Sequence, residues 1–120
     1  MSTNQEDRCI FCRIIRGELV ADIVYKDDIA TAFWDASPKA PVHILIVPNQ
    51  HIQSVNEISQ VDEAVFGHLF SVARHIAQMQ NIHQSGYRLV TNVGVDGGQS
   101  IFHLHLHLLG GRRLGHFSNW

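Results

Sequence analysis

The seven residues HLHLHLL, at positions 103–109, decide the fold of this chain. His103, His105 and His107 alternate with leucines, and in a β-strand alternate side chains point to opposite faces of the sheet. Three imidazoles therefore line one face while the leucines enter the core. Neighbours on one face lie about 6.5–7 Å apart, which lets adjacent imidazoles serve one reacting group or one metal ion.

Two other interpretations of this histidine stretch stay open at the level of sequence. One is a half-exposed strand with histidines on its wet face, although Lys, Thr, Glu or Ser is normally mixed in at such positions. The other is a catalytic zinc ion held by an H-x-H pair. That site needs a further ligand, for which His51 or His43 is available, and an open position for water.

A glycine loop lies just before the histidines, with the sequence Asp96-Gly97-Gly98-Gln99-Ser100. Glycine has no Cβ, so backbone N–H groups in such a loop can approach an anion closely. A Gly-Gly pair alone is more often simply a turn. Beside three histidines, the loop indicates a phosphate group held for chemistry.

The rest of the chain predicts an α+β domain. Hydrophobic periodicity indicates a short helix within residues 9–19, which Gly17 is expected to end, and a long amphipathic helix at residues 60–80. Strands are expected at residues 23–25, 29–34, 42–47, 87–92 and 101–109. Hairpins rather than strict β-α-β alternation favour a mainly antiparallel sheet of five strands. We expect a flexible N-terminus at residues 1–8, one domain at residues 9–112 and a C-terminal tail at residues 113–120.

The composition excludes several classes of protein. Of the 120 residues, 45% are hydrophobic and 17% are charged, as in a globular protein and unlike a disordered one. The formal net charge of −2 gives no basic field, so we expect no nucleic-acid binding. No run approaches the about 18 apolar residues that span a bilayer, and the polar, acidic start is unlike a signal peptide. We therefore expect a cytoplasmic protein that does not bind a membrane.

These motifs together resemble the histidine triad family. Ser100 followed by His103, His105 and His107 is similar to the family signature. Three further motifs resemble its nucleotide-binding branch: Asp35-x-Ser37-Pro38-x-Ala40-Pro41-x-His43, Pro48-x-x-His51 and Gly97-Gly98-Gln99-Ser100. The resemblance covers residues 9–112, nearly the whole chain. It implies a HIT-like fold and a homodimer in which the helix at residues 60–80 is the main contact and two sheets join across a two-fold axis.

The resemblance also implies a reaction. By similarity, His105 is the nucleophile that forms a nucleotidyl-histidine, which water then hydrolyses. His107 and the N–H groups around Ser100 stabilise charge on the phosphoryl oxygens. The Ser100 hydroxyl makes a hydrogen bond to the leaving atom. The implied substrates are purine nucleoside phosphoramidates, such as AMP or GMP amines, and aminoacyl adenylates, with no cofactor required. Two alternatives are a dinucleoside polyphosphate hydrolase and an AMP-binding regulatory module with vestigial catalysis.

A nucleotide site follows from the same resemblance. Asp35 matches the carboxylate that binds the ribose hydroxyls, and Asn92 matches a contact to the phosphate or ribose. Apolar residues match the wall of the base pocket: Ile10, Phe11, Ile14 and Phe33. His43, Gly98 and Gln99 complete the predicted nucleotide-binding residues, and a hydrogen-bonded core histidine is the alternative for His43. In the tail, Phe117 or Trp120 is expected to reach the partner's active site.

Some bacterial relatives in this family carry a structural zinc ion, and the four matching positions here are Cys9, Cys12, His51 and His103. Two thiolates and two imidazoles make a closed tetrahedral zinc site that has no position for catalytic water. Other members lack the cysteines and have no metal, so the sequence leaves zinc open. If zinc is bound, His103 is structural and His105 remains the nucleophile.

Overall fold

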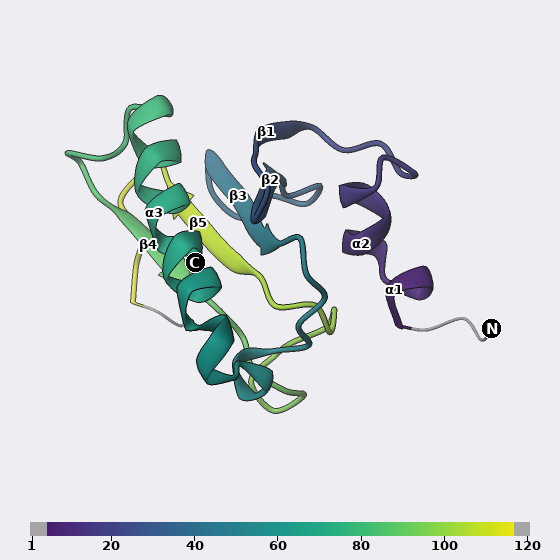
Figure 1. The fold of residues 1–120 in the computed structure, drawn as a ribbon. Coiled ribbons are helices and arrows are strands. Elements are labelled where there is room, and N and C mark those ends of the chain that lie inside the picture. The colour runs from purple at the N-terminus through teal and green to yellow at the C-terminus, as the bar shows by residue number, and fades with distance from the viewer. Residues whose placement is uncertain (1–4, 117–120) are drawn as a thin grey trace.

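The computed structural model describes residues 5–116 (Figure 1). The expectations for residues 1–4, and those for Phe117 and Trp120, lie outside the described residues. The helical elements are α1 (Gln5–Arg8), α2 (Ile10–Ile15), the 3-10 turns η1 (Val55–Glu57) and η2 (Gln60–Asp62), and α3 (Glu63–Met79). The strands are β1 (Ile23–Lys26), β2 (Ala30–Trp34), β3 (Val42–Pro48), β4 (Tyr87–Val90) and β5 (Leu106–Gly110).

The five strands form one sheet in the order β1-β2-β3-β5-β4. Within residues 5–116, every strand pairing is antiparallel, which confirms the predicted α+β class with a long and a short helix beside the sheet. β3 lies at the centre, and all seven of its residues are buried. The register between β3 and β5 pairs Leu45 with His107 and His43 with Leu109, so the third triad histidine lies on the most buried strand pair.

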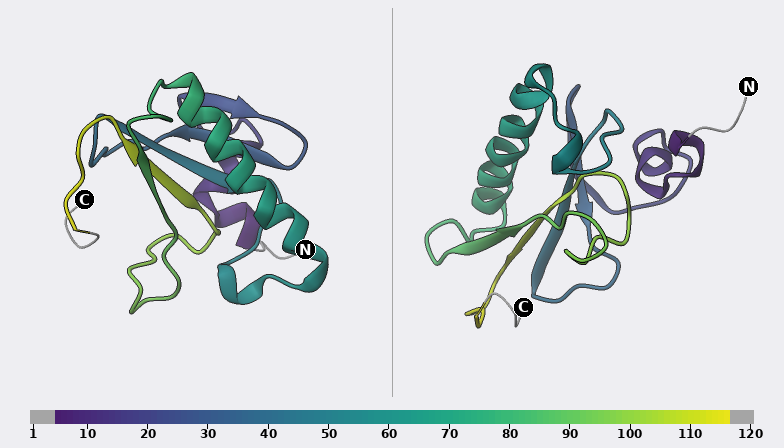
Figure 2. Two further views of the ribbon diagram at one scale, coloured as in Figure 1. Left: turned by 90° about the vertical axis from the view of Figure 1, so that its left-hand side faces the viewer. Right: turned by 90° about the horizontal axis from the view of Figure 1, so that it is seen from below.

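Helices cover the two faces of the sheet. α3 lies along one face, and α1 and α2 lie against the other, as the end-on view in Figure 2 shows. On the α3 side the core includes Leu69, Val72, Ile76, Ile44, Ile46, Leu104, Leu106 and Leu108. On the α2 side a smaller core contains Phe11, Ile14, Phe33, Leu45 and Val47. The alternation predicted from residues 103–109 is confirmed, because its alternating leucines pack beneath α3.

The structure contains both predicted helices, and α3 is shorter than the periodicity indicated. α2 ends at Ile15, and the prediction that Gly17 ends this helix is confirmed, because Gly17 adopts a positive φ of 79° and its N–H donates to the carbonyl of Ile14. α3 begins at Glu63, since residues 60–62 form a 3-10 turn capped by reciprocal bonds between Ser59 and Asp62. No helix in the described part of the chain is long and apolar enough to cross a membrane.

The strand that carries the triad also begins later than predicted. β5 starts at Leu106, whereas the expected range was 101–109. The N–H of Leu104 bonds the carbonyl of Ile52, in a loop outside the sheet, and His103 bonds the carbonyl of Pro48. Residues 101–105 therefore follow a loop while keeping alternate side chains on opposite sides. Of the three triad histidines, His107 alone lies within β5.

Candidate active site

The three triad histidines line the buried side of the molecule that faces α2. His103 has no exposed surface, His105 is 7% exposed and His107 is half-buried. The Phe11 ring, from α2, makes T-shaped contacts with the rings of His103 and His105, with centroid separations of 5.8 and 5.2 Å. The interpretation as a wet, half-exposed strand face is therefore wrong.

A backbone carbonyl fixes the proton on His105. Its Nδ1 lies 2.7 Å from the carbonyl oxygen of His103. A carbonyl can only accept, so Nδ1 carries the hydrogen and the neutral ring keeps its lone pair on Nε2. Burial lowers the pKa of His105, although the same carbonyl opposes the shift by favouring the protonated ring. His105 is thus a neutral imidazole whose Nε2 keeps its lone pair.

His43 and His107 form a second hydrogen-bonded pair, across β3 and β5. The backbone N–H of Lys39 donates to Nδ1 of His43 at 3.0 Å, so the proton of neutral His43 is on Nε2. That nitrogen lies 2.9 Å from Nδ1 of His107 and 3.5 Å from Oδ2 of Asp35. His107 accepts through Nδ1 and carries its own proton on Nε2. We call these two linked hydrogen bonds, from the Lys39 N–H to His43 and from His43 to His107, the histidine relay.

Burial keeps the relay uncharged at neutral pH. It lowers the pKa of His107 to about 4, and the neighbouring His105 and His43 add to the shift because their charges would repel another proton. Burial also lowers the pKa of His43, against the opposing effect of the Asp35 carboxylate. A neutral His107 with its proton on Nε2 is a hydrogen-bond donor and a potential general acid.

A large pocket with a volume of about 660 Å³ is lined by Phe11, whose ring contacts His103 and His105, although none of the triad histidines lines it. Its walls include all four residues expected to contact a base, Ile10, Phe11, Ile14 and Phe33, together with Asp35, Leu45 and Ile101. The volume lies within the range of small-molecule sites. The Asp35 carboxylate is held by the N–H of Ser37, which donates to Oδ1 at 2.7 Å. The pocket therefore combines an apolar wall with one oriented carboxylate.

The glycine loop is held by its own hydrogen bonds. Gln99 is buried, its Oε1 accepts from the N–H of Gly94, and its Nε2 donates to the carbonyls of Gln53 and Ile101. The N–H groups of Gly98 and Gln99 also donate within the loop. Gly98 and Gln99 therefore shape the loop. Ser100, which follows them, is exposed and can donate a hydrogen bond to a phosphate.

Close packing requires glycine at one position of this loop. A Cβ added to Gly97 would lie 2.3 Å from the carbonyl oxygen of Val93, which backbone cannot accommodate. The Gly97 carbonyl accepts a hydrogen bond from Nδ2 of Asn92 at 2.8 Å. Asn92, predicted to contact the nucleotide, thus uses one of its two amide hydrogens to hold the loop, and its second amide hydrogen and its Oδ1 can contact a ligand.

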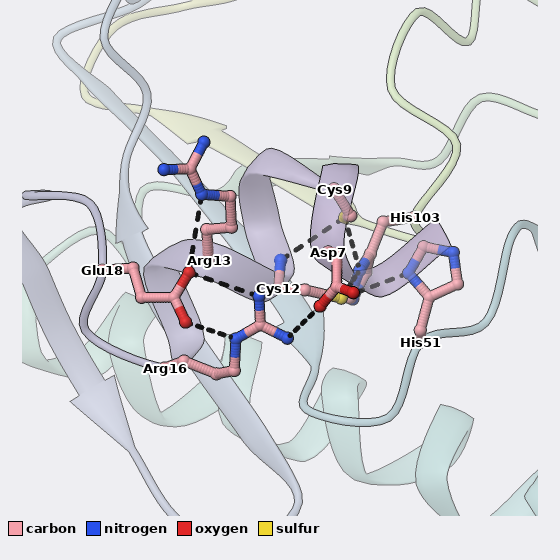
Figure 3. A network of polar contacts seen from close by, with 8 residues as sticks. All are labelled: Asp7, Cys9, Cys12, Arg13, Arg16, Glu18, His51 and His103. Carbon is pink, nitrogen blue, oxygen red and sulfur yellow. Dashed lines mark hydrogen bonds and ion pairs between the residues drawn. The ribbon is translucent and has the colours of Figure 1, made fainter. Parts of the chain in front are cut away.

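The predicted metal ligands come together at the N-terminus of α2 (Figure 3). Nε2 of His103 donates to the carbonyl of Pro48 at 2.8 Å, which turns Nδ1 toward Cys9 Sγ at 3.3 Å and Cys12 Sγ at 3.5 Å. Nδ1 of His51 lies 3.2 Å from Cys12 Sγ. The four donor atoms all lie within 4.8 Å of one another.

These separations fit a tetrahedral zinc ion. Zn–S bonds of about 2.3 Å and Zn–N bonds of about 2.0–2.1 Å place neighbouring S and N donors roughly 3.5 Å apart. Nε2 of His51 is buried without a hydrogen-bond partner in the described part of the chain. The ring is therefore oriented by the contact of its Nδ1 with Cys12 Sγ. Burial raises the pKa of Cys12 to about 12, and a cation at this site would favour the thiolate instead.

The alternative of a catalytic zinc on an H-x-H pair does not match the geometry. Within the described residues, the second group of clustered metal donors is Asp35, His43 and His107. His43 and His107 are in direct hydrogen-bond contact at 2.9 Å. His105 belongs to neither group, since its Nδ1 is committed to a carbonyl. Adjacent triad histidines therefore do not converge on one ion.

Sequence reasoning predicts a backbone carbonyl as the partner of His105 but could not say which backbone groups orient the three histidines. They are the N–H of Lys39 and the carbonyls of Pro48 and His103. Every residue type supplies these groups, so no residue pattern reports them. It also missed several pocket-lining residues, including Leu19, Ala36, Leu45 and Ile101, whose apolar character looks the same whether they fill a core or line a cavity.

An α+β sheet with a buried histidine triad beside a pocket defines the class of this protein, and comparisons with known proteins agree. The model of the HIT domain matches residues 16–114. The purine nucleoside phosphoramidase of Escherichia coli K12 is 50% identical over 109 residues, which cover 91% of this chain and 92% of that protein. An uncharacterized HIT-like protein of Buchnera aphidicola is 48% identical, with 94% and 99% of the two chains covered.

Solved structures give the same result. A histidine triad protein from Clostridium difficile superposes with a TM-score of 0.90 at 39% identity, covering 98% of this chain and 99% of the other. A HIT family hydrolase from Legionella pneumophila has a TM-score of 0.89 at 41% identity, covering 91% and 97%. The chain therefore belongs to the HIT domain family, and its relatives include hydrolases.

Proposed function

We propose that this protein hydrolyses purine nucleoside phosphoramidates through a nucleotidyl-histidine intermediate on His105. One observation carries the proposal: Nδ1 of His105 bonds a carbonyl, so Nε2 keeps its lone pair in a buried site next to a nucleoside-sized pocket. The 50% identity to a protein named purine nucleoside phosphoramidase supports the choice of substrate. AMP and GMP derivatives are the expected forms.

In the first step, Nε2 of His105 attacks the α-phosphorus and the P–N bond to the amine breaks. The departing amine needs a proton, and the Nε2–H of His107 is placed to give it. His43 can then pass its own Nε2 proton to Nδ1 of His107 across their 2.9 Å contact. The pair is then one proton short and carries one negative charge, which balances the positive charge that the His105 ring gains when its Nε2 bonds phosphorus.

In the second step, water attacks the nucleotidyl-histidine and the bond from phosphorus to Nε2 of His105 breaks. The same relay, now one proton short, accepts the proton of the attacking water, so His107 acts first as acid and then as base. His105 leaves as a neutral imidazole and not as an anion, because its Nδ1 keeps the hydrogen that it donates to the His103 carbonyl. The products are the free amine and the nucleoside monophosphate.

The pocket residues bind the nucleoside in this proposal. Asp35, held by Ser37, accepts hydrogen bonds from the ribose hydroxyls, for which a carboxylate with two oxygens is suited. Ile10, Phe11, Ile14 and Phe33 form the apolar wall against the purine. Ser100 and Asn92 contact the phosphate and the leaving atom, while Gly98 and Gln99 fix the loop that presents Ser100.

We also propose that Cys9, Cys12, His51 and His103 hold a structural zinc ion. When bound, zinc links α2 to the loops that carry His51 and His103 and supplies no reacting group, since four protein ligands close its coordination sphere. The carbonyl of His103 accepts a hydrogen bond from Nδ1 of His105. The proposed nucleophile is therefore in direct contact with one of the four proposed zinc ligands. Metal-bound thiolates persist in a reducing compartment, which agrees with the proposed cytoplasmic location.

A homodimer is the proposed assembly. β4 is an edge strand that pairs with β5 on one side, and its outer edge can pair with a second copy. Large apolar side chains on and beside α3 are exposed: Val61, Phe70 and Met79 at 85%, 40% and 51%. A two-fold axis beside β4 and α3 would join the two sheets and cover these side chains.

The proposed function is tested with His105→Asn, which keeps an amide nitrogen near the Nδ1 position but has no nucleophilic nitrogen. We expect turnover of adenosine 5′-phosphoramidate to fall by roughly 10³-fold or more, as for removal of other covalent nucleophiles, while AMP still binds in calorimetry. A variant that retains turnover rules out His105 as the nucleophile. If the wild-type protein binds AMP but does not hydrolyse the phosphoramidate, the regulatory alternative is favoured.

A further inference from the structure

We propose that Cys9 and Cys12 form a reversible redox pair whose oxidation to a disulfide releases the metal and slows turnover at His105. The formation of the disulfide and the release of metal are independent of the substrate, and the effect on turnover rests on the proposed function. The inference comes from three observations: the position of the pair on α2, the pocket at Cys9, and the contacts of both sulfurs with His103.

The two cysteines are placed where a disulfide can form with little movement. Cys9 is the N-cap of α2, with an extended backbone at φ −81° and ψ 121°, and its Sγ accepts the N–H of Cys12 at 3.4 Å. Residues three apart on a helix have Cβ atoms about 5–6 Å apart, and a disulfide needs about 3.5–4.5 Å. The Sγ atoms already lie within 4.8 Å of each other.

One of the two sulfurs is accessible and the other is not. Cys9 is partly exposed and lines a surface pocket of about 320 Å³ that also contains Arg8, His51 and Ser100. Cys12 is 6% exposed. A small oxidant such as hydrogen peroxide therefore reaches Cys9 first, and Cys12 lies beside it as the resolving thiol.

The reaction balances with peroxide as the oxidant. The Cys9 sulfur attacks one oxygen of hydrogen peroxide, the O–O bond breaks, and a sulfenic acid and water form. The Cys12 sulfur then attacks the Cys9 sulfur, an S–S bond forms, and a second water leaves. Two thiols and one peroxide thus give one disulfide and two waters, and a dithiol reductant reverses the change by thiol–disulfide exchange.

Oxidation replaces a cross-link between three segments with a local one. In the reduced state, both sulfurs face Nδ1 of His103 and Cys12 faces His51, so a zinc ion bound there would tie α2 to the two loops that carry these histidines. A disulfide between Cys9 and Cys12 closes one turn of one helix and leaves both loops without that link. The His103 loop supplies the carbonyl that orients His105, so the catalytic imidazole loses its fixed orientation.

The test uses zinc-loaded protein titrated with hydrogen peroxide. Trypsin cleaves after Arg8 and Arg13, so residues 9–13 form one peptide that contains both cysteines. We expect this peptide to become lighter by two hydrogen atoms, zinc to appear in a chromogenic chelator in step with that loss, and turnover to fall about tenfold, as for loss of other outer-shell supports. Dithiothreitol with added zinc should restore both the mass and the turnover.

The double variant Cys9→Ser/Cys12→Ser is the matched control, because it has no thiol to oxidise. Its turnover should not respond to peroxide. The proposal is overturned if the wild-type peptide gains oxygen instead of losing hydrogen, if the disulfide joins two chains, or if the double variant is inhibited equally. The peptide mass and the zinc release are read on the wild-type protein, so they decide the redox claim even if the variant is unstable or phosphoramidates are not the substrate.

Discussion

Nδ1 of His105 lies 2.7 Å from the backbone carbonyl oxygen of His103, two residues earlier in the chain. This contact places the proton on Nδ1 and leaves the lone pair on Nε2. His103 in turn faces Cys9 and Cys12 through its own Nδ1. His103 therefore connects the proposed nucleophile, His105, to the candidate zinc site. We expect that a change at the zinc site also alters turnover at His105.

Replacing His43 should impair protonation of the leaving group. His43→Ala removes the donor to Nδ1 of His107, so we expect kcat to fall by about 10–100-fold, as for other groups that orient a catalytic residue. The loss should be larger for a basic alkylamine leaving group than for a weakly basic arylamine, which departs without full protonation. Parallel kinetics with both substrates measure the difference. The exposed His83→Ala is the control, and equal losses for the two substrates would show that His43 has a merely structural role.

Stability should decline with acid because of His107. Its pKa is about 4 in the folded protein against about 6.5 in an unfolded chain. Between these values the unfolded state binds the proton and the folded state does not, so the free energy of unfolding falls as pH drops from 6.5 toward 4, by at most about 1.4 kcal/mol per pH unit from this group. Above pH 6.5 this contribution is constant.

Urea unfolding at pH 7 and pH 5 measures this slope. His107→Asn has no group that titrates in this range, so its stability should change less between the two values than that of the wild-type protein. The comparison of slopes matters, since the substitution also changes stability at every pH. If the two proteins lose the same free energy on acidification, His107 does not carry the titration.

Removal of zinc should destabilise the protein without abolishing turnover. Dialysis of the zinc-loaded protein against a chelator removes a ligand of the folded state, and we expect the Tm to fall by about 5 °C or more. Turnover measured well below the new Tm should fall but persist, because zinc contributes no reacting group in this account. Calorimetry and kinetics on the same sample separate the effects. A complete loss of turnover with an intact fold would instead indicate a catalytic metal.

The exposed apolar surface of α3 should form the contact between two copies. Phe70→Glu places a charge on a side chain that is 40% exposed and packs on Phe66, and we expect it to convert a dimer into monomers in sedimentation analysis. Ile23→Glu is the matched control: Ile23 is 43% exposed but lies on β1, the opposite edge of the sheet. A wild-type monomer, or dissociation by both substitutions alike, contradicts this assembly.

Much of the fold could be predicted because side-chain alternation and helical periodicity are local properties. The leucines at 104, 106 and 108 lie in the core as expected, although β5 begins only at Leu106. The start of β5 could not be predicted, since it depends on a bond from Leu104 to Ile52 that no residue pattern reports. The end of α2 could be predicted, because glycine readily adopts the positive φ that Gly17 shows after the helix.

The candidate site could be predicted as a set of residues but not as a geometry. Motif resemblance selected the four ligands that lie together at α2 and the four apolar residues that line one pocket. It could not give the tautomers of His43, His105 and His107, because these follow from backbone groups. It also placed Gln99 among the nucleotide contacts, whereas its side chain is engaged inside the loop. The roles of these residues stay predictions until they are measured.

The most direct test of the account is the location of the covalent intermediate. Adenosine 5′-phosphoramidate is mixed rapidly with the protein, the reaction is stopped in alkaline denaturant to preserve a phosphorus–imidazole bond, and the peptides are analysed by mass spectrometry and phosphorus NMR. We predict one adenylyl group per site, attached to Nε2 of His105 and absent from His105→Asn. An adduct on another residue or on Nδ1, or single-step turnover with no adduct at any time, would contradict the central claim.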